Sequence, residues 1–476
     1  MVNLVVLDLL LLALFVILIS FFLYKNRKNL GQEGWLMLYR TKWGIKLIDY
    51  VGKKYQKTLK ILSYISIATG YVLMVGIVIL IIQSVYLYFT SSILQNFKAP
   101  PVAPLIPYFP KIFGLEGFFP EFYFIDFIIA ILIVATVHEF SHGIFARRYN
   151  IRIKSTGFAF LKYFPAIFGA FVEQDDKQMT KKTKFSQMSV LSAGVFANII
   201  TSILFYFILF LFFSVSFSAT GVGFNSYSYS IVNVSKIDSV NGIEVNNIQN
   251  YDNLLENLEE EGLNEFSAED KNYIASKKFL ENQKENQGLI ILYNDAPAIR
   301  AGIGNIILKI NGEATTSLEK LESELKKYSP GDVVEIETLE SSDIKKYNVE
   351  LKENPNDKTR VWLGVGFLSQ KQSGVIGKTI SYFPSYKEPY VYYEPKNELS
   401  SFIKDLLWWI VIINLLVGFF NMLPLGILDG GRFFYLTILS ITKSEKIAKK
   451  FFSIVSLLIF LLFFLLLARW IFIRIL

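Results

Sequence analysis

The chain has 476 residues, of which 52% are hydrophobic and 16% aromatic, and its mean hydropathy is +0.39. This composition is too apolar for an ordinary soluble protein of this length and indicates a membrane protein. The formal net charge of +7 does not indicate nucleic-acid binding, because much of the basic excess lies in loops beside apolar stretches. The absence of cysteine excludes disulfides, thiolate metal sites and cysteine nucleophiles.

Residues 1–121 contain two apolar stretches. Leu4–Tyr24 has the length of a membrane span and lacks the basic start and cleavage site of a signal peptide, so we expect a retained transmembrane helix. Residues 25–57 carry nine Lys or Arg against two acidic residues, which is typical of a cytoplasmic loop and places the N-terminus outside. Ile61–Tyr88 is the second predicted span, and residues 100–120 form an external loop rich in Pro and Phe.

The third predicted span begins near Phe122 and contains the sequence His138-Glu139-Phe140-Ser141-His142. In a helix the two histidines lie one turn apart on the same face, with Glu139 beside them. In this H-E-x-x-H pattern two imidazoles bind zinc and the glutamate handles the proton of a zinc-bound water. These are the only two histidines in the chain. The alternative is that they are polar residues satisfied inside a helix, but ionisable groups at membrane depth are functional candidates by default.

Residues 122–215 are expected to form the first part of a catalytic core. Thr156–Val172 is aromatic and interrupted by glycine and proline, which predicts a re-entrant or interfacial segment beside the site. A loop on the membrane surface is an equally good reading of its composition. The fourth span, Phe185–Val215, contains Gly194 and Asn198, a spacing that permits close helix packing. Asn198 taken alone fits helix packing as well as catalysis.

Residues 216–400 have a soluble composition and are expected to form an extracytoplasmic domain. Within residues 288–370, strand Ile306–Ile310 ends in Asn311-Gly312 and is followed by helix Leu318–Tyr328 and strand Val333–Leu339, an order that resembles a PDZ domain. Residues 231–287 repeat part of this order, which predicts either a degenerate second PDZ-like unit or one domain with an elaborated first half. PDZ domains bind extended peptides by strand addition, but no ligand is indicated.

Residues 401–476 form the expected second part of the core. A fifth span from Phe402 leads into a segment, residues 421–432, in which Pro424 and several glycines break the helix. A catalytic zinc commonly has three protein ligands, and with no further histidine or cysteine the third must be a carboxylate, for which Asp429 is best placed. A helix-capping role is the alternative for this residue. A basic loop, residues 443–450, precedes the sixth span, Phe451–Ile473.

The H-E-x-x-H helix, the Gly194 and Asn198 pair, the PDZ-like insertion and the NMLPLGILDGG segment together resemble the site-2 protease family of intramembrane zinc metalloproteases. The resemblance extends from about Phe122 to the C-terminus. It implies an α-helical polytopic membrane protein of about six transmembrane helices with an inserted α+β PDZ-like domain. It implies also that one Zn²⁺ is bound by His138, His142 and Asp429, that Glu139 is the general base, and that Asn198 and Asn421 lie around the substrate peptide.

The expected activity is therefore hydrolysis of peptide bonds within or near transmembrane helices of single-span membrane proteins. The site is expected within the bilayer, nearer the cytoplasmic face, because Arg147 and Arg148 mark the cytoplasmic end of the third span. Single-span substrates and membrane lipid are the expected partners, and nucleic acid is not. A zinc-binding transporter or sensor, or a catalytically inactive PDZ scaffold, are the alternatives.

Overall fold

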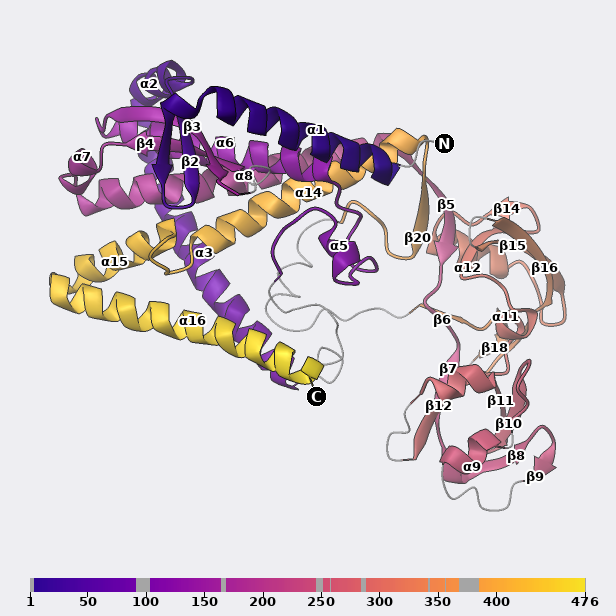
Figure 1. The fold of residues 1–476 in the computed structure, drawn as a ribbon. Helices are drawn as coiled ribbons and strands as arrows, with labels where there is room; N and C mark the ends of the chain where they lie inside the picture. The colour runs from indigo at the N-terminus through magenta and orange to yellow at the C-terminus, as the bar shows by residue number, and fades with distance from the viewer. Residues whose placement is uncertain are drawn as a thin grey trace. The chain divides into compact units, whose positions relative to one another are not determined.

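The structure is a computed structural model that describes residues 4–90, 103–163, 168–244, 251–256, 258–283, 288–340, 343–355, 357–367 and 385–475. The chain forms two compact units (Figure 1). Unit 1 consists of Met1–Phe212 and Ser401–Leu476, and unit 2 consists of Phe213–Ser400. The second unit nearly coincides with the extramembrane region expected at residues 216–400.

Unit 1 is built on long apolar helices. In the described part of the chain, six helices are long and apolar enough to cross a membrane, so the chain has the features of a multi-pass membrane protein. They are α1 (Leu4–Lys25), α3 (Gln56–Thr90), α6 (Phe124–Arg148), α8 (Lys184–Ser216), α14 (Glu398–Asn421) and α16 (Glu445–Ile475). Each of the six predicted spans corresponds to one of these helices, and the third, predicted to begin near Phe122, begins at Phe124.

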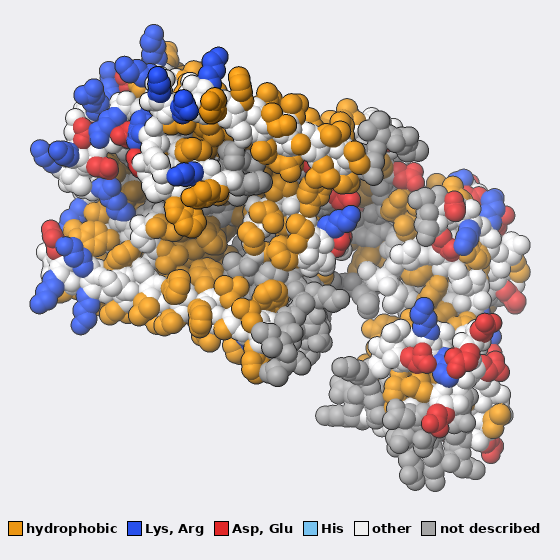
Figure 2. Space-filling model, in the orientation of Figure 1, with side chains coloured by type: hydrophobic (Ala, Val, Ile, Leu, Met, Phe, Trp, Pro, Cys, Tyr) orange, Lys and Arg blue, Asp and Glu red, His pale blue; other side chains and the backbone are white. Residues whose placement is uncertain are grey.

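Basic side chains gather at one end of unit 1. Figure 2 shows Lys and Arg over the end that carries α2 (Ile45–Lys54), α7 (Asp176–Thr180) and the turn from α15 (Asp429–Thr442) into α16. The basic loops at residues 25–57 and 443–450 and the basic run at residues 177–184 therefore lie at the same end of the helices, as alternating spans require.

A four-stranded antiparallel sheet lies in unit 1. It consists of β1 (Leu30–Glu33), β2 (Leu36–Thr41), β3 (Ile153–Leu161) and β4 (Phe168–Gln174), in that order. Thr156–Val172, predicted as an irregular re-entrant or interfacial segment, thus forms most of a strand pair, apart from residues 164–167, which lie outside the described residues. A lone hairpin is only marginally stable, and β2 from the distant N-terminal loop supplies the third strand. Gly157 permits this pairing, because a Cβ there would lie 2.0 Å from the carbonyl oxygen of Tyr39.

The N-terminal end of α6 is held by a carboxylate from another helix. The first amides of α6 have no partner within the helix. Asp8 of α1 accepts hydrogen bonds from the amides of Phe124, at 2.7 Å, and Ile125, at 3.0 Å. Asp126 accepts from the amide of Tyr123 at 3.0 Å. The helix that carries both histidines is therefore fixed at its start by α1.

Unit 2 contains two six-stranded sheets, each with its own hydrophobic core. The first has the order β7 (Tyr229–Asn233), β12 (Leu289–Asn294), β11 (Lys271–Ala275), β10 (Asn264–Ala268), β8 (Ile237–Val240), β9 (Ile243–Glu244), with helices α9 (Tyr251–Glu256) and α10 (Lys277–Glu281). The second has the order β16 (Asp343–Glu350), β15 (Val333–Glu340), β13 (Ile306–Ile310), β5 (Phe217–Gly223), β20 (Val391–Pro395), with β14 (Glu313–Ala314) beside β13 and helices α11 (Pro297–Ala301) and α12 (Leu318–Leu325). Two short strand pairs complete the unit: β17 (Lys352–Asn354) with β18 (Asp357–Trp362), and β6 (Ser226–Tyr227) with β19 (Val365–Gly366).

The two sheets share a local arrangement. Asn241-Gly242 and Asn311-Gly312 are both left-handed turns, and each joins a strand to a short returning strand. The side chain of Asn241 accepts from the amide of Glu265, at 2.9 Å, as that of Asn311 accepts from the amide of Glu335, at 2.8 Å. The repeat seen in the sequence is therefore present in three dimensions. Strand β12, expected to begin the better-formed PDZ-like part at residue 288, belongs instead to the first sheet, because it pairs with β7 and β11.

Candidate metal centre

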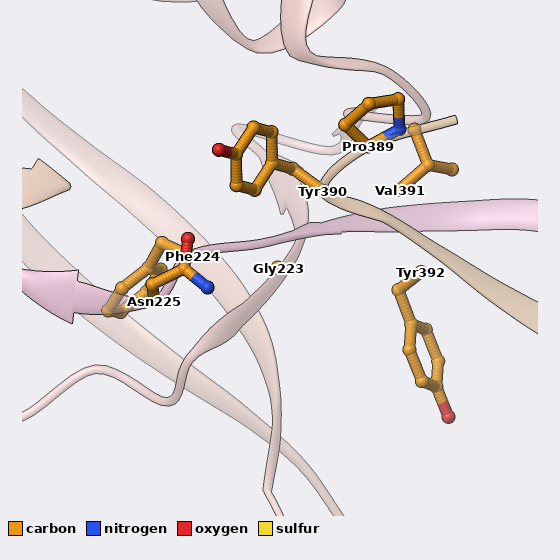
Figure 3. Close-up of a pocket in the computed structure, with 7 residues that line it drawn as sticks. All are labelled: Gly223, Phe224, Asn225, Pro389, Tyr390, Val391 and Tyr392. Atoms are coloured by element: carbon orange, nitrogen blue, oxygen red, sulfur yellow. The ribbon is translucent and has the colours of Figure 1, made fainter. Parts of the chain in front are cut away.

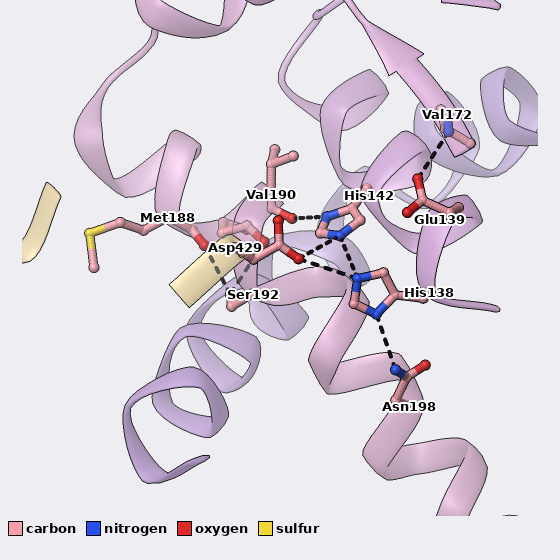
Figure 4. A network of polar contacts seen from close by, with 10 residues as sticks. His138, Glu139, His142, Val172, Met188, Val190, Ser192, Asn198 and Asp429 are labelled. Atoms are coloured by element: carbon pink, nitrogen blue, oxygen red, sulfur yellow. Dashed lines mark hydrogen bonds and ion pairs between the residues drawn. The ribbon is translucent and has the colours of Figure 1, made fainter. Parts of the chain in front are cut away.

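The two histidines of α6 converge on one carboxylate (Figure 4). The Nε2 atoms of His138 and His142 are 3.0 Å apart, and they lie 3.2 Å and 3.1 Å from the Oδ2 atom of Asp429. Both rings are buried. The helical spacing of four residues brings the rings together, and the tertiary fold brings the carboxylate across 287 residues of chain.

Asp429 reaches this position because the chain breaks between α14 and α15. Pro424 cannot continue α14, and its carbonyl oxygen accepts a hydrogen bond from Ser456 of α16 at 2.6 Å. Gly430 and Gly431 let the start of α15 pack on this break, since a Cβ on either would lie within 2.5 Å of a carbonyl oxygen, that of Met422 or Leu425. Asp429 is the first residue of α15, and its side-chain contacts are with His138 and His142.

Helix α8 lies directly behind the two imidazoles. The Nδ1 atom of His142 lies 2.7 Å from the carbonyl oxygen of Val190, and the Nδ1 atom of His138 lies 3.1 Å from the side-chain amide of Asn198. Gly194 lies between these two contacts, and a Cβ there would be 2.5–2.6 Å from ring atoms of both histidines. The three α8 residues are four apart and share one face. Gly194 and Asn198 therefore contact the histidines of the site, in addition to allowing close helix packing.

The side chains fit a metal ion. A carbonyl oxygen can only accept, so His142 carries its proton on Nδ1 and presents a lone pair from Nε2. In the neutral ring this lone pair faces a second imidazole and a carboxylate oxygen, so the three atoms can share a cation, either a proton or a metal ion. Ligand atoms at about 2 Å from a tetrahedral ion lie about 3.3 Å apart, close to the separations of 3.0–3.2 Å found here. Of the described residues, only these three form a group of this kind.

Glu139 points away from the metal ligands toward the sheet. Its Oε2 atom accepts a hydrogen bond from the backbone amide of Val172 in β4 at 2.9 Å (Figure 4). Strand β4 thereby orients the glutamate, a contact between two segments 33 residues apart. No sequence pattern predicts this contact, because the donor is a backbone group.

A cavity of about 440 Å³ opens on the centre. Its polar walls include Glu139, the three candidate ligands, Gln174 and Asn421, and its apolar walls include Phe168 of β4 and Ile427 beside Asp429. Asn421, which the resemblance places around the substrate peptide, lines this cavity. Asn198, which the resemblance also places there, is 0% exposed and contacts the ring of His138.

Comparison with known proteins assigns the chain to a family. The model of "Peptidase family M50" matches residues 126–467, most of the chain, and its range contains all the residues of the centre. The chain belongs to peptidase family M50. This is the site-2 protease family, as the motifs had indicated. An uncharacterized protein of Methanocaldococcus jannaschii, MJ0971, is 25% identical over 423 residues, which cover 87% of this chain and 81% of that protein.

A second cavity, of about 470 Å³, lies in unit 2 of this M50 chain (Figure 3). It is lined by the end of β5 and the start of β20, with the rings of Phe224, Tyr390 and Tyr392 around it. Its seven lining residues include no carboxylate and no imidazole. Although this cavity is slightly larger, only the one in unit 1 has the acid, base and ligand groups that hydrolysis needs.

Proposed function

We propose that this M50 protein is an intramembrane zinc metalloprotease that hydrolyses peptide bonds within or near transmembrane helices of membrane protein substrates. One observation carries the proposal. Two imidazoles of an apolar helix and a carboxylate from a distant helix break converge within 3.2 Å of one another, beside a glutamate, in a cavity. Neither metal transport nor a scaffold function requires three ligand groups, a glutamate beside them and a cavity in the same place.

His138, His142 and Asp429 would hold the ion. When bound, Zn²⁺ supplies a Lewis acid that polarises a peptide carbonyl and makes water acidic near neutral pH. Val190 and Asn198 orient the two imidazoles from behind, so that both present Nε2 to the ion.

Glu139 would act as the general base. The amide of Val172 binds Oε2 and fixes the carboxylate, so Oε1 is the atom that takes the proton of the attacking water. The same atom then gives the proton to the leaving nitrogen. Asn421 lines the cavity and can donate its amide to a substrate carbonyl.

The edge of β4 is the proposed binding place for the substrate backbone. A helical substrate must unwind locally before its carbonyl can be attacked, which exposes backbone groups that need partners. β4 is the last strand of its sheet, and Phe168 and Gly169 line the cavity. The amide of Val172 points away from β3, so that of Ala170, two residues earlier, points the same way. An unwound segment can therefore pair with this edge by strand addition.

Apolar side chains beside the ligands favour apolar substrates. Ile427 is 92% exposed and lines the cavity two residues before Asp429. An exposed isoleucine in a site of this kind is suited to contact an aliphatic side chain, as in a transmembrane segment. Single-span membrane proteins are the proposed substrates.

We propose that the basic end of unit 1 faces the cytoplasm, following the positive-inside rule. The centre would then lie within the bilayer nearer the cytoplasmic side, since His142 is six residues before Arg148, at the end of α6. Unit 2 and the N-terminus would be extracytoplasmic. The repeated Asn-Gly turn arrangement supports two PDZ-like subdomains in unit 2.

The test is cleavage of single-span membrane proteins by the purified full chain in detergent. Glu139→Gln should reduce cleavage by about a thousandfold or more, in keeping with loss of a general base, while bound zinc stays at one per chain. Glu116→Gln, which removes an exposed carboxylate elsewhere in unit 1, is the matched control and should cleave normally. Unchanged cleavage by Glu139→Gln would contradict the proposal.

A further inference from the structure

Helix α2 presents an apolar stripe bordered by lysines. Leu47 and Tyr50 are one helical turn apart in α2 and are both 54% exposed, and Trp43, two residues before the helix begins, is 71% exposed. Four exposed lysines border this stripe: Lys42, Lys46, Lys53 and Lys54. We call these seven residues the α2 surface.

The opposite face of α2 is packed on the metal-binding helix. Ile48 is fully buried, and Asp49 forms an ion pair with Arg147 of α6 at 2.5 Å. Gly52 permits the close approach, since a Cβ there would lie 2.8 Å from the carbonyl oxygen of Ile144. The ring of Trp43 also contacts Phe140, which lies inside the H-E-x-x-H sequence, with ring centroids 5.9 Å apart. These contacts therefore couple the position of α2 to that of α6.

The position of α2 along the chain places it at the edge of the apolar region. It ends at Lys54, and the candidate span α3 begins at Gln56. Its contacts on α6 reach Arg147, next to the end of that span at Arg148. The start of α3 and the end of α6 therefore both place α2 at the level where the spans of unit 1 end.

The chemistry of the α2 surface matches a membrane boundary. Trp and Tyr are enriched at the level of lipid headgroups, and lysines extend their charged ends into water while their stems cover apolar surface. A basic amphipathic helix of this composition lies in the interface and is attracted to anionic lipids. A protein partner fits less well, because lysine is depleted from the centres of protein interfaces.

We propose that the α2 surface binds anionic phospholipid headgroups and thereby fixes the depth of the metal-binding helix in the membrane. The lysines contact lipid phosphates, and the stripe of Trp43, Leu47 and Tyr50 inserts at the boundary of the acyl chains. This interaction is independent of catalysis, so it can be tested without a substrate.

The absence of cysteine allows a clean test on the full chain. Leu47→Cys, labelled with an environment-sensitive dye, is reconstituted in vesicles of phosphatidylcholine alone or with phosphatidylglycerol added. The emission should shift to the blue when phosphatidylglycerol is present, and salt should reduce this shift. Ile231→Cys, an exposed apolar position in β7, is the matched label and should not respond to the lipid.

A charge variant separates lipid binding from simple insertion. Lys46→Gln with Lys53→Gln in the labelled chain should abolish most of the phosphatidylglycerol-dependent shift, whereas Lys320→Gln with Lys326→Gln on α12 should leave it intact. Equal emission in both lipids would overturn the proposal.

Discussion

Gly194 lies against His138 so closely that a Cβ at this position would be 2.6 Å from the Nε2 atom of the ring. Gly194→Ala must therefore displace His138, His142 or helix α8. We expect zinc affinity to fall by at least about tenfold, the range found when groups that orient metal ligands are removed. Chelator competition measures this directly. Gly418→Ala, whose Cβ would come no closer than 3.3 Å to another atom, the flexible end of Ile199, is the control and should bind zinc normally.

Asn198 contacts the ring of His138, and we expect it to orient this ring. The structure has Nδ2 of Asn198 toward Nδ1 of His138 and leaves Oδ1 buried without a partner. With a metal on Nε2 the ring carries its proton on Nδ1, so the amide of Asn198 must turn over to present its oxygen to that proton. Asn198→Ala should weaken zinc binding by about 10–100-fold, and Asn198→Asp, which can still accept this proton, should weaken it less. Wild-type zinc affinity in Asn198→Ala, together with a raised KM, would instead favour the substrate contact inferred from the family resemblance.

Removal of the metal should abolish cleavage reversibly. Dialysis against a chelator should inactivate the protein, and added Zn²⁺ should restore activity, because no other described group supplies a Lewis acid in the cavity. Asp429→Ala should bind zinc only weakly, and added Zn²⁺ should not restore its cleavage activity. Asp405→Ala in α14 should retain zinc, and a chain that still cleaves after complete metal removal would exclude the metalloprotease assignment.

The edge of β4 can be blocked without breaking the sheet. Ala170→Pro removes an N–H that points away from β3, so the strand pair should survive while the substrate loses a backbone partner. We expect cleavage to fall by about tenfold with unchanged zinc content, which corresponds to one lost hydrogen bond of about 1.4 kcal/mol. Ala170→Val keeps the N–H and should cleave at nearly the normal rate. Equal losses in both variants would indicate a steric effect.

The cap that Asp8 places on α6 should contribute to stability. Asp8→Ala leaves the amides of Phe124 and Ile125 without their acceptor in a buried place, which should cost about 2 kcal/mol. The loss is measured as a lower unfolding midpoint in detergent. Leu9→Ala, on an exposed position of the same helix, should change the midpoint little. An unchanged midpoint in Asp8→Ala would show that water or lipid headgroups satisfy these amides.

The sequence alone predicted the six apolar helices, because membrane length and hydrophobicity are local properties of a stretch of chain. It also predicted that His138 and His142 share a face, since their spacing equals about one helical turn. It could not predict the sheet of β1–β4, whose strands come from two loops more than 100 residues apart, one basic and one broken by glycine and proline. Strand pairing across such distances leaves no periodic signal in either loop.

Within the centre, the sequence named three ligand candidates, because a chain with two histidines and no cysteine leaves a carboxylate for the third, and Asp429 lies in the helix break after the fifth span. Only the tertiary structure decided what surrounds them. It placed Asn198 behind a histidine, the carbonyl of Val190 on the other ring, and the amide of Val172 on Glu139. Two of these three partners are backbone groups, which every residue carries, so their role follows from position in space and not from sequence.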